Sequence, residues 1–379
     1  MPCPPPADVR NAISSPRTGH RGNLLTPDSP TAKAGSTHLL EVRNLATRFA
    51  TADGYVQAVD GVSFHIDEGE ILGLVGESGC GKSVTSLSVM RLIPNPPGEI
   101  TDGQVLFEGT DLRQISEQDM RRVRGGSIGM IFQEPMTSLN PVLTIGRQIT
   151  EAFEVHLDLK GRAARDRAVE ILNRVGLPDP SKKFDDYPHQ LSGGQRQRAM
   201  IAMAISCNPR LLIADEATTA LDVTIQAQIL ELLQSLCDEF KMALLIITHN
   251  LGVVARYAQR VAVMYAGKII ESGTADEIYA TPQHPYTTGL LSSVPRLDAS
   301  ARDRLESIEG EIPDLANLPA GCAFEPRCRW AVDRCGIQSP DQVPVRPSQG
   351  RLAEGTAHQV ACWESENIAA GTALGKQPS

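Results

Sequence analysis

A glycine-rich loop carries the residues of this chain that are best suited to phosphate chemistry. It consists of eight consecutive residues: Gly76, Glu77, Ser78, Gly79, Cys80, Gly81, Lys82 and Ser83. An apolar segment, 71–75, precedes the loop and a helix-like segment, 84–92, follows it, which is the order of a phosphate-binding loop. Glycines allow backbone N–H groups to face a phosphate, and the helix N-terminus adds partial positive charge. We expect Lys82 to reach the β- and γ-phosphates of a nucleotide and Ser83 to bind Mg²⁺.

Polar side chains with catalytic potential end three later apolar segments. These segments end at Gln133, at Asp215 and Glu216, and near His249. Beside a phosphate loop, the first carboxylate holds Mg²⁺ through water and the second polarises an attacking water. A glutamine here either binds Mg²⁺ and water or simply caps the strand. A histidine at the carboxyl edge of an open α/β sheet lies where ligands bind, so it is a candidate γ-phosphate contact.

A second loop also suits anion binding. It reads Ser192, Gly193, Gly194 and Gln195, and it opens a helix expected over 196–207. Serine and two glycines at a helix N-terminus expose N–H groups to an anion. This loop lacks the lysine and the Mg²⁺-binding hydroxyl of the phosphate loop. The chain therefore carries two helix N-termini suited to phosphate binding, and only one of them has these two groups.

Two aromatic residues upstream of the phosphate loop are candidates for stacking on adenine. They are Phe49, which we expect to be the stacking residue, and Tyr55 as the alternative. An aromatic face stacks on any base, but both rings could instead pack on a sheet edge.

An α/β framework is needed to position these loops. Short strands are expected at 40–43, 56–59, 62–66 and 104–107, and helices at 144–157 and 162–175. The two helices form a helical insertion. Residues 1–37 are rich in Pro, Ser, Thr and Gly, which indicates a disordered N-terminal tail.

The composition excludes several classes of protein. The chain has 379 residues, 41% of them hydrophobic, and its longest apolar runs are far too short to cross a bilayer. No secretory signal is visible at the N-terminus, so we expect a cytoplasmic protein. The formal charge of −9 gives no general attraction to nucleic acid or anionic lipid.

Four of the eight cysteines are crowded near the C-terminus. They are Cys322, Cys328, Cys335 and Cys362, in a C-x5-C-x6-C-x26-C pattern. The Pro- and Gly-rich segments around them contain too few apolar residues to form a robust core. In a reducing compartment, a bound metal is more suitable than disulfides for stabilising such segments. Four thiolates suit either Zn²⁺ or an iron–sulfur cluster. The alternative is four free thiols.

The assembled motifs resemble those of the ATP-binding cassette ATPases, in the family's order, over most of residues 38–290. The resemblance implies a phosphate-loop (RecA-like) core with an antiparallel β edge and a helical subdomain at about 134–208. It also implies a head-to-tail dimer in which the second loop of one subunit covers the ATP of the other. By resemblance, Glu216 is the general base, His249 stabilises charge on the γ-phosphate, and Asp222 communicates across the dimer.

Three stretches, 133–141, 284–287 and 321–328, resemble the dipeptide/oligopeptide permease ATP-binding subunits. This implies a Cys-rich C-terminal extension over 291–379, with a [4Fe–4S] cluster favoured and zinc as the alternative. It also implies an ATPase on the cytoplasmic face of the inner membrane that energises peptide import. The partners implied are two transmembrane permease subunits, a second ATPase subunit and, indirectly, a solute-binding protein; nickel or another peptide-like solute is an alternative substrate.

Two other hypotheses are compatible with parts of the sequence. One is a soluble cassette ATPase that works on nucleic acid or ribosomes, but the single cassette, the absence of sustained heptads and the negative charge argue against it. The other makes the C-terminal cysteines a redox-sensing module, which is compatible with transport.

Overall fold

The computed structural model describes residues 38–133, 138–217, 223–293, 308–345 and 358–369. All of these residues fall in one compact unit, Lys33–Ser379. The tail expected over 1–37 and the predicted dimer contact Asp222 lie outside the described residues. Among the described helices, none combines the length and apolar character needed to cross a bilayer.

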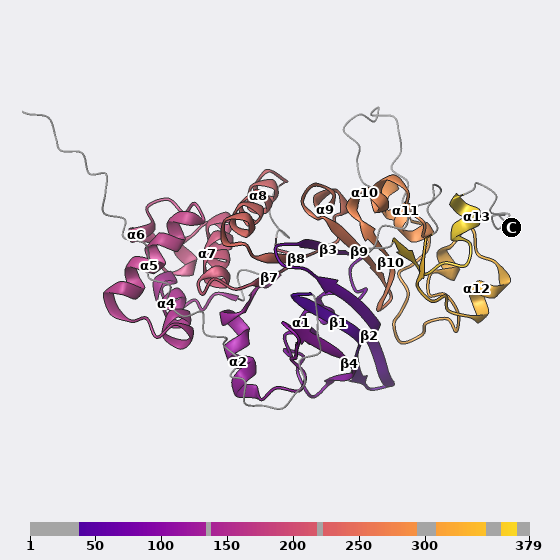
Figure 1. Ribbon diagram of the computed structural model, residues 1–379, viewed down its shortest axis with the longest axis horizontal. Helices are drawn as coiled ribbons and strands as arrows, with labels where there is room; N and C mark the ends of the chain where they lie inside the picture. The colour runs from indigo at the N-terminus through magenta and orange to yellow at the C-terminus, as the bar shows by residue number, and fades with distance from the viewer. Residues whose placement is uncertain (1–37, 134–137, 218–222, 294–307, 346–357, 370–379) are drawn as a thin grey trace, which may run out of the picture. The chain divides into compact units, whose positions relative to one another are not determined.

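A four-stranded antiparallel sheet comes first along the chain (Figure 1). Its strand order is β2 (Gly54–Ile66), β1 (Leu40–Thr51), β4 (Gly98–Phe107) and β5 (Thr110–Asp111). The antiparallel strands expected from the sequence are therefore present, but they form a sheet of their own rather than an edge of the main sheet. The reason is that β1 pairs with β2 on one side and with β4 on the other. The segments 56–59 and 62–66 also belong to one long strand, β2.

The main sheet has eight strands. Their order is β11 (Val343–Pro344), β12 (Gln359–Val360), β10 (Lys268–Thr274), β9 (Arg260–Tyr265), β3 (Ile71–Val75), β8 (Ala243–Thr248), β7 (Leu211–Asp215) and β6 (Ile128–Ile131). The five strands from β9 to β6 are parallel, and β3, β7 and β8 are buried along their whole length, as parallel strands covered on both faces are. Their carboxyl ends meet at one edge, where the candidate catalytic residues follow them.

Helices cover this sheet and form a separate group at one end of it (Figure 1). Helices α1 (Lys82–Val89), α8 (Val223–Phe240) and α9 (Leu251–Tyr257) lie along the sheet, and α2 (Glu117–Gly126) precedes β6. The separate group contains α4 (Ile145–His156), α5 (Gly161–Arg174), the short α6 (Pro180–Lys183) and α7 (Gly193–Ile205). The helices expected at 144–157 and 162–175 are present as α4 and α5, and they bury Phe153 and Leu172.

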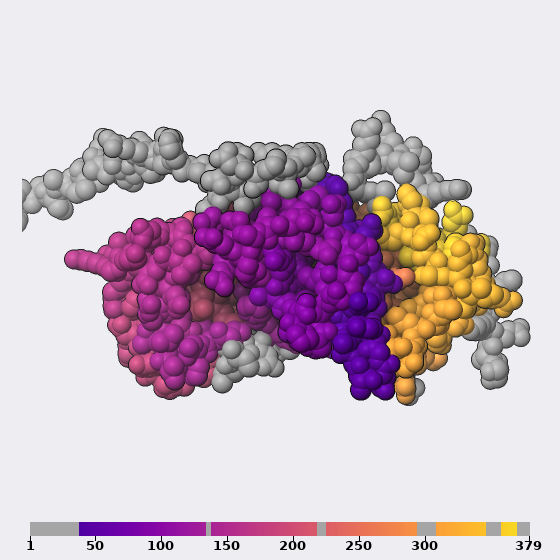
Figure 2. Space-filling model, turned by 90° about the horizontal axis from the view of Figure 1, so that it is seen from below, coloured from indigo at the N-terminus to yellow at the C-terminus, as the bar shows by residue number. Residues whose placement is uncertain are grey.

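The C-terminal residues are joined to the main sheet through β12, which pairs with β10. They include α10 (Ala275–Ala280), α11 (Pro285–Ser292), the 3₁₀ turn η2 (Glu325–Arg327), α12 (Asp333–Ile337) and α13 (Ser365–Ala369). The buried carboxylate of Glu271 on β10 accepts bonds from the backbone N–H groups of Gln283 and His284 and contacts Nε2 of His358 at 2.7 Å. In Figure 2 this segment, in orange and yellow, lies directly against the N-terminal strands, in indigo.

Candidate nucleotide-binding site

The phosphate loop connects β3 to α1 and depends on two of its glycines. Gly76 has φ of 157° and Gly81 has φ of 105°, both in the left-handed region that favours glycine. A Cβ at Gly76 would lie 2.2 Å from the carbonyl oxygen of Met264, and one at Gly81 would lie 2.3 Å from that of Ala58. Backbone conformation and close packing therefore both require glycine at these positions.

Lys82 lies at the start of α1 with its ammonium group folded across the loop. Its Nζ donates hydrogen bonds to the carbonyl oxygens of Gly76 at 3.0 Å and Glu77 at 2.9 Å, and the residue is only 3% exposed. The loop thus holds a buried cation at a helix N-terminus, where an anion is favoured.

Ser83 and Asp215 form the part of the site suited to Mg²⁺. The Ser83 hydroxyl donates to Oδ1 of Asp215 at 2.9 Å, and the Ser86 hydroxyl approaches Oδ2 at 3.3 Å. Burial raises the pKa of Asp215, and the hydroxyl donors counter part of that rise. A buried carboxylate next to a hydroxyl offers the oxygen ligands that Mg²⁺ prefers.

Three candidate catalytic side chains meet beside Asp215. Nε2 of Gln133 donates to Oε2 of Glu216 at 2.9 Å, and Nδ1 of His249 lies 3.6 Å from Oε1 of Glu216. Gln133 follows β6, Glu216 follows β7 and His249 follows β8. The side chain of Glu216 is only 10% exposed. Glu216 has φ of 46°, which is unusual for a residue with a side chain and typical of functional positions.

The second loop forms the start of α7. Ser192 is the N-cap: its Oγ accepts from the backbone N–H of Gln195 at 3.4 Å, and Oε1 of Gln195 accepts from the N–H of Ser192 at 3.1 Å. Gly193 is exposed, with open space where a Cβ would be. The helix end is therefore capped within the chain and still reachable from solvent.

The two candidate adenine-stacking residues lie in different environments. Phe49 is half-buried, and a Cβ on Gly98 would lie 2.8 Å from its ring, so Gly98 leaves room for that ring. Tyr55 is 65% exposed, and the guanidinium of Arg48 lies 4.3 Å from the centre of its ring. The sequence-based preference for Phe49 stays a prediction.

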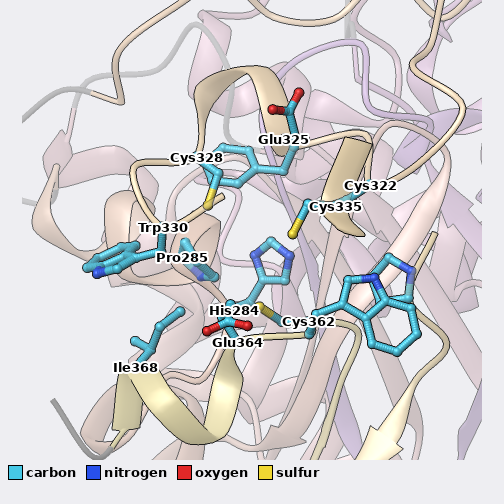
Figure 3. A pocket seen from close by; sticks show the side chains of 13 residues that line it. His284, Pro285, Cys322, Glu325, Cys328, Trp330, Cys335, Cys362, Glu364 and Ile368 are labelled. Atoms are coloured by element: carbon cyan, nitrogen blue, oxygen red, sulfur yellow. The ribbon is translucent and has the colours of Figure 1, made fainter. Parts of the chain in front are cut away.

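The four C-terminal cysteines line one cavity together with His284. Figure 3 shows these side chains around the imidazole of His284. The described cysteines form no disulfide. Burial raises the pKa of Cys322, and that of Cys362 to about 12, so these thiols stay neutral unless a bound cation displaces their protons.

The spacing of these thiols bears on which group they could hold. A single zinc ion with four sulfurs at about 2.3 Å needs sulfur–sulfur distances of about 3.8 Å. No three of the four sulfur atoms, all of which are described, lie within 4.8 Å of one another. The four thiols therefore share one cavity without forming a compact cluster of sulfur atoms.

Another group of ligand-type side chains contains His38, His65 and Asp67, whose ligand atoms lie within 4.8 Å of one another. The two imidazoles stack with their centres 3.9 Å apart, and Nδ1 of His38 lies 2.5 Å from the Asp67 carboxylate. The guanidinium of Arg260 donates to the backbone carbonyl of His65, which places a positive charge nearby. Because the two imidazoles pack face to face and His38 already contacts the Asp67 carboxylate, we interpret this group as a packing cluster.

The sequence analysis missed one contact of the phosphate loop. Arg327, between Cys322 and Cys328, binds the carboxylate of Glu77 through both terminal nitrogens, at 2.7 and 3.1 Å. No local pattern could reveal this pair, because 250 residues separate its members.

The phosphate loop is hydrogen-bonded, through Ser83, to Asp215 at the end of β7 in a largely parallel sheet. This combination defines a phosphate-loop nucleotide-binding protein of the cassette type.

Residues 59–219 match the family described as ABC transporter, and residues 270–335 match the one described as oligopeptide/dipeptide transporter, C-terminal region. The chain is 57% identical over 309 residues to the oligopeptide transport ATP-binding protein OppD of Bacillus subtilis, covering 82% of this chain and 86% of that protein. It is 50% identical over 327 residues to the dipeptide transport ATP-binding protein DppD of the same organism, covering 86% and 94%.

Solved structures agree with this assignment. The dimeric post-hydrolysis state of the ATP-binding cassette MJ0796, bound to ADP and Pi, matches with a TM-score of 0.56 and 26% identity, covering 62% of this chain and 98% of that one. CbiO1 from Clostridium perfringens matches with a TM-score of 0.56 and 27% identity, covering 65% and 92%. The chain therefore belongs to the family of ATP-binding subunits of oligopeptide and dipeptide ABC transporters.

Proposed function

We propose that this chain hydrolyses ATP to energise the import of dipeptides or oligopeptides. Lys82 and the loop N–H groups bind the phosphates, Ser83 and Asp215 hold Mg²⁺, and Glu216 activates the attacking water. Gln133 and His249 orient that water and stabilise the γ-phosphate. The observation that carries the proposal is the 2.9 Å bond from Ser83 to Asp215, because it brings the Glu216 strand end next to the phosphate loop.

The proposed assembly contains two copies of the cassette. The 192–195 loop of one subunit covers the ATP on the phosphate loop of the other, which accounts for an exposed helix start that lacks a lysine of its own. Closure and reopening of this dimer moves two transmembrane permease subunits, so the chain acts peripherally at the cytoplasmic face of the membrane. A solute-binding protein delivers the peptide.

Purification of the tagged chain from gently solubilised native membranes tests this function. We expect two multi-span permease subunits, and in some preparations a second ATPase, to co-purify. The reconstituted complex should take up labelled peptide with ATP, and Lys82→Ala should abolish both uptake and hydrolysis. Recovery of only soluble partners or nucleic acid would contradict the transporter assignment.

We also propose that Cys322, Cys328, Cys335 and Cys362 hold a [4Fe–4S] cluster. The convergence of the four thiols on one cavity supports it, because four cysteine thiolates are the ligand set of such a cluster. When bound, such a cluster supplies one-electron redox chemistry and a covalent staple for this segment. Anaerobic purification with iron, sulfide and zinc determination tests it: a brown protein with iron and sulfide is expected, and a colourless protein with stoichiometric zinc would overturn it.

A further inference from the structure

The C-terminal segment contacts the phosphate loop directly. The guanidinium of Arg327 binds both carboxylate oxygens of Glu77, the second residue of that loop, and its Nε donates to the carbonyl of Glu309 at 3.1 Å. The Arg327 side chain is only 5% exposed and that of Glu77 is 22% exposed. Paired, two-pronged bonds of this kind are among the strongest polar contacts in proteins, because they fix geometry as well as charge.

Aromatic side chains hold this contact in place. The hydroxyl of Tyr286 accepts a bond of 2.8 Å from the backbone N–H of Glu77. The ring of Phe324 packs on the rings of Tyr265 and Tyr286, with centres 5.3 and 5.5 Å apart. Phe324 and Arg327 both lie between Cys322 and Cys328, so the same short segment lines the thiol cavity and supports the loop.

The charge of Glu77 explains why the loop needs this support. A carboxylate in a loop that binds a triphosphate repels its ligand, and the repulsion is strong where water is excluded. The Arg327 guanidinium neutralises that carboxylate and fixes its position. The carbonyl of Glu77 also accepts from Lys82 at 2.9 Å, so movement of Glu77 displaces the lysine that contacts the ligand.

We infer that Arg327 is a positioning and charge-compensating residue for ATP binding, which acts through Glu77. The inference rests on the proposed ATP site, but it does not depend on which group the cysteines hold. This role of Arg327 makes the ATP site incomplete without the C-terminal segment, although that segment follows the whole cassette in sequence.

The test compares four full-length variants by titration with a fluorescent ATP analogue displaced by ATP. Arg327→Met should weaken ATP binding by roughly tenfold, the loss expected when a charge-assisted bond is removed. Glu77→Gln should instead strengthen binding by about two- to threefold, because it removes a negative charge from the loop and leaves the positive charge of Arg327 uncompensated. The double variant should recover most of the loss, and Arg327→Lys should lie between the wild type and Arg327→Met.

Arg329→Met is the matched control, since Arg329 is exposed in the same segment and packs on Trp330 rather than on the loop. It should bind ATP like the wild type. Thermal unfolding of each variant separates misfolding from a local effect. If Arg327→Met and Glu77→Gln weaken binding equally and the double variant recovers nothing, the pair is merely structural and the inference is wrong. If Lys82→Ala still binds ATP normally, the proposed site itself is wrong.

Discussion

The amide of Gln133 donates a 2.9 Å hydrogen bond to the carboxylate of Glu216. Gln133 follows β6 and Glu216 follows β7, which are neighbouring parallel strands, so the bond crosses the carboxyl edge of the main sheet. His249, after β8, lies 3.6 Å from the other carboxylate oxygen. The carboxylate is thus held from two sides next to Asp215, and this fixed position suits the proposed role of Glu216 as general base.

Replacement of Glu216 by Gln should separate ATP binding from hydrolysis. The amide keeps the shape of the side chain but cannot accept a proton, so we expect turnover to fall by at least about 100-fold. ATP should still bind and should hold two subunits together as a dimer, detectable by size-exclusion chromatography with light scattering. Glu231→Gln is the control, because Glu231 lies on α8 in a surface ion pair with Arg256. Substantial ATP hydrolysis by the Glu216→Gln variant would show that Glu216 is not the general base.

Local sequence patterns predicted the phosphate loop, the strand ends and the helical insertion correctly, because each depends on neighbours in sequence. The structure groups Gln133, Glu216 and His249 because each follows a parallel strand and parallel strands end at the same edge. The separate four-stranded sheet and the pairing of β12 with β10 could not be predicted, since strand pairing across long separations depends on tertiary packing. The bond between Glu77 and Arg327 could not be predicted for the same reason.

Substitution of Phe49 by Ala should weaken ATP binding if this ring stacks on the adenine. Loss of one base–aromatic stack costs about 1–3 kcal/mol, which corresponds to a roughly 5- to 150-fold higher Kd. Titration with ATP and GTP should show similar losses, because stacking does not read base identity. Tyr55→Ala serves as the comparison: a larger loss in that variant would transfer the stacking role to the exposed tyrosine.

The stability of the fold should depend on pH through His65. Burial, followed by the nearby charges of Arg260 and His38, lowers the pKa of His65 from its usual 6.5 to about 4, although Asp67 and Glu41 act in the opposite direction. Between these values the unfolded chain binds a proton that the folded chain does not, so the free energy of unfolding falls as the pH drops from 6.5 towards 4.

Urea unfolding at about pH 7 and about pH 5 measures this effect. His65→Gln should remove about 1–2 kcal/mol of the difference, a value already reduced for the partial exposure of the ring. His189→Gln is the control, because His189 is exposed on the helical group. An unchanged difference in the His65 variant would show that other groups cause the pH dependence.

Single replacements of the cavity cysteines should remove the proposed iron–sulfur cluster and loosen the C-terminal segment. Cys335→Ser or Cys362→Ser deletes one of the four proposed thiol ligands, so anaerobically purified protein should lose its iron and its brown absorbance. Residues 308–345 and 358–369 should become sensitive to protease. Cys237→Ala is the control, since burial in the core raises the pKa of that thiol to about 12 and it lies outside the cavity. Because Arg327 lies next to Cys328, loss of the group should also weaken ATP binding, as Arg327→Met does. Iron retained in both serine variants would exclude these cysteines as its ligands.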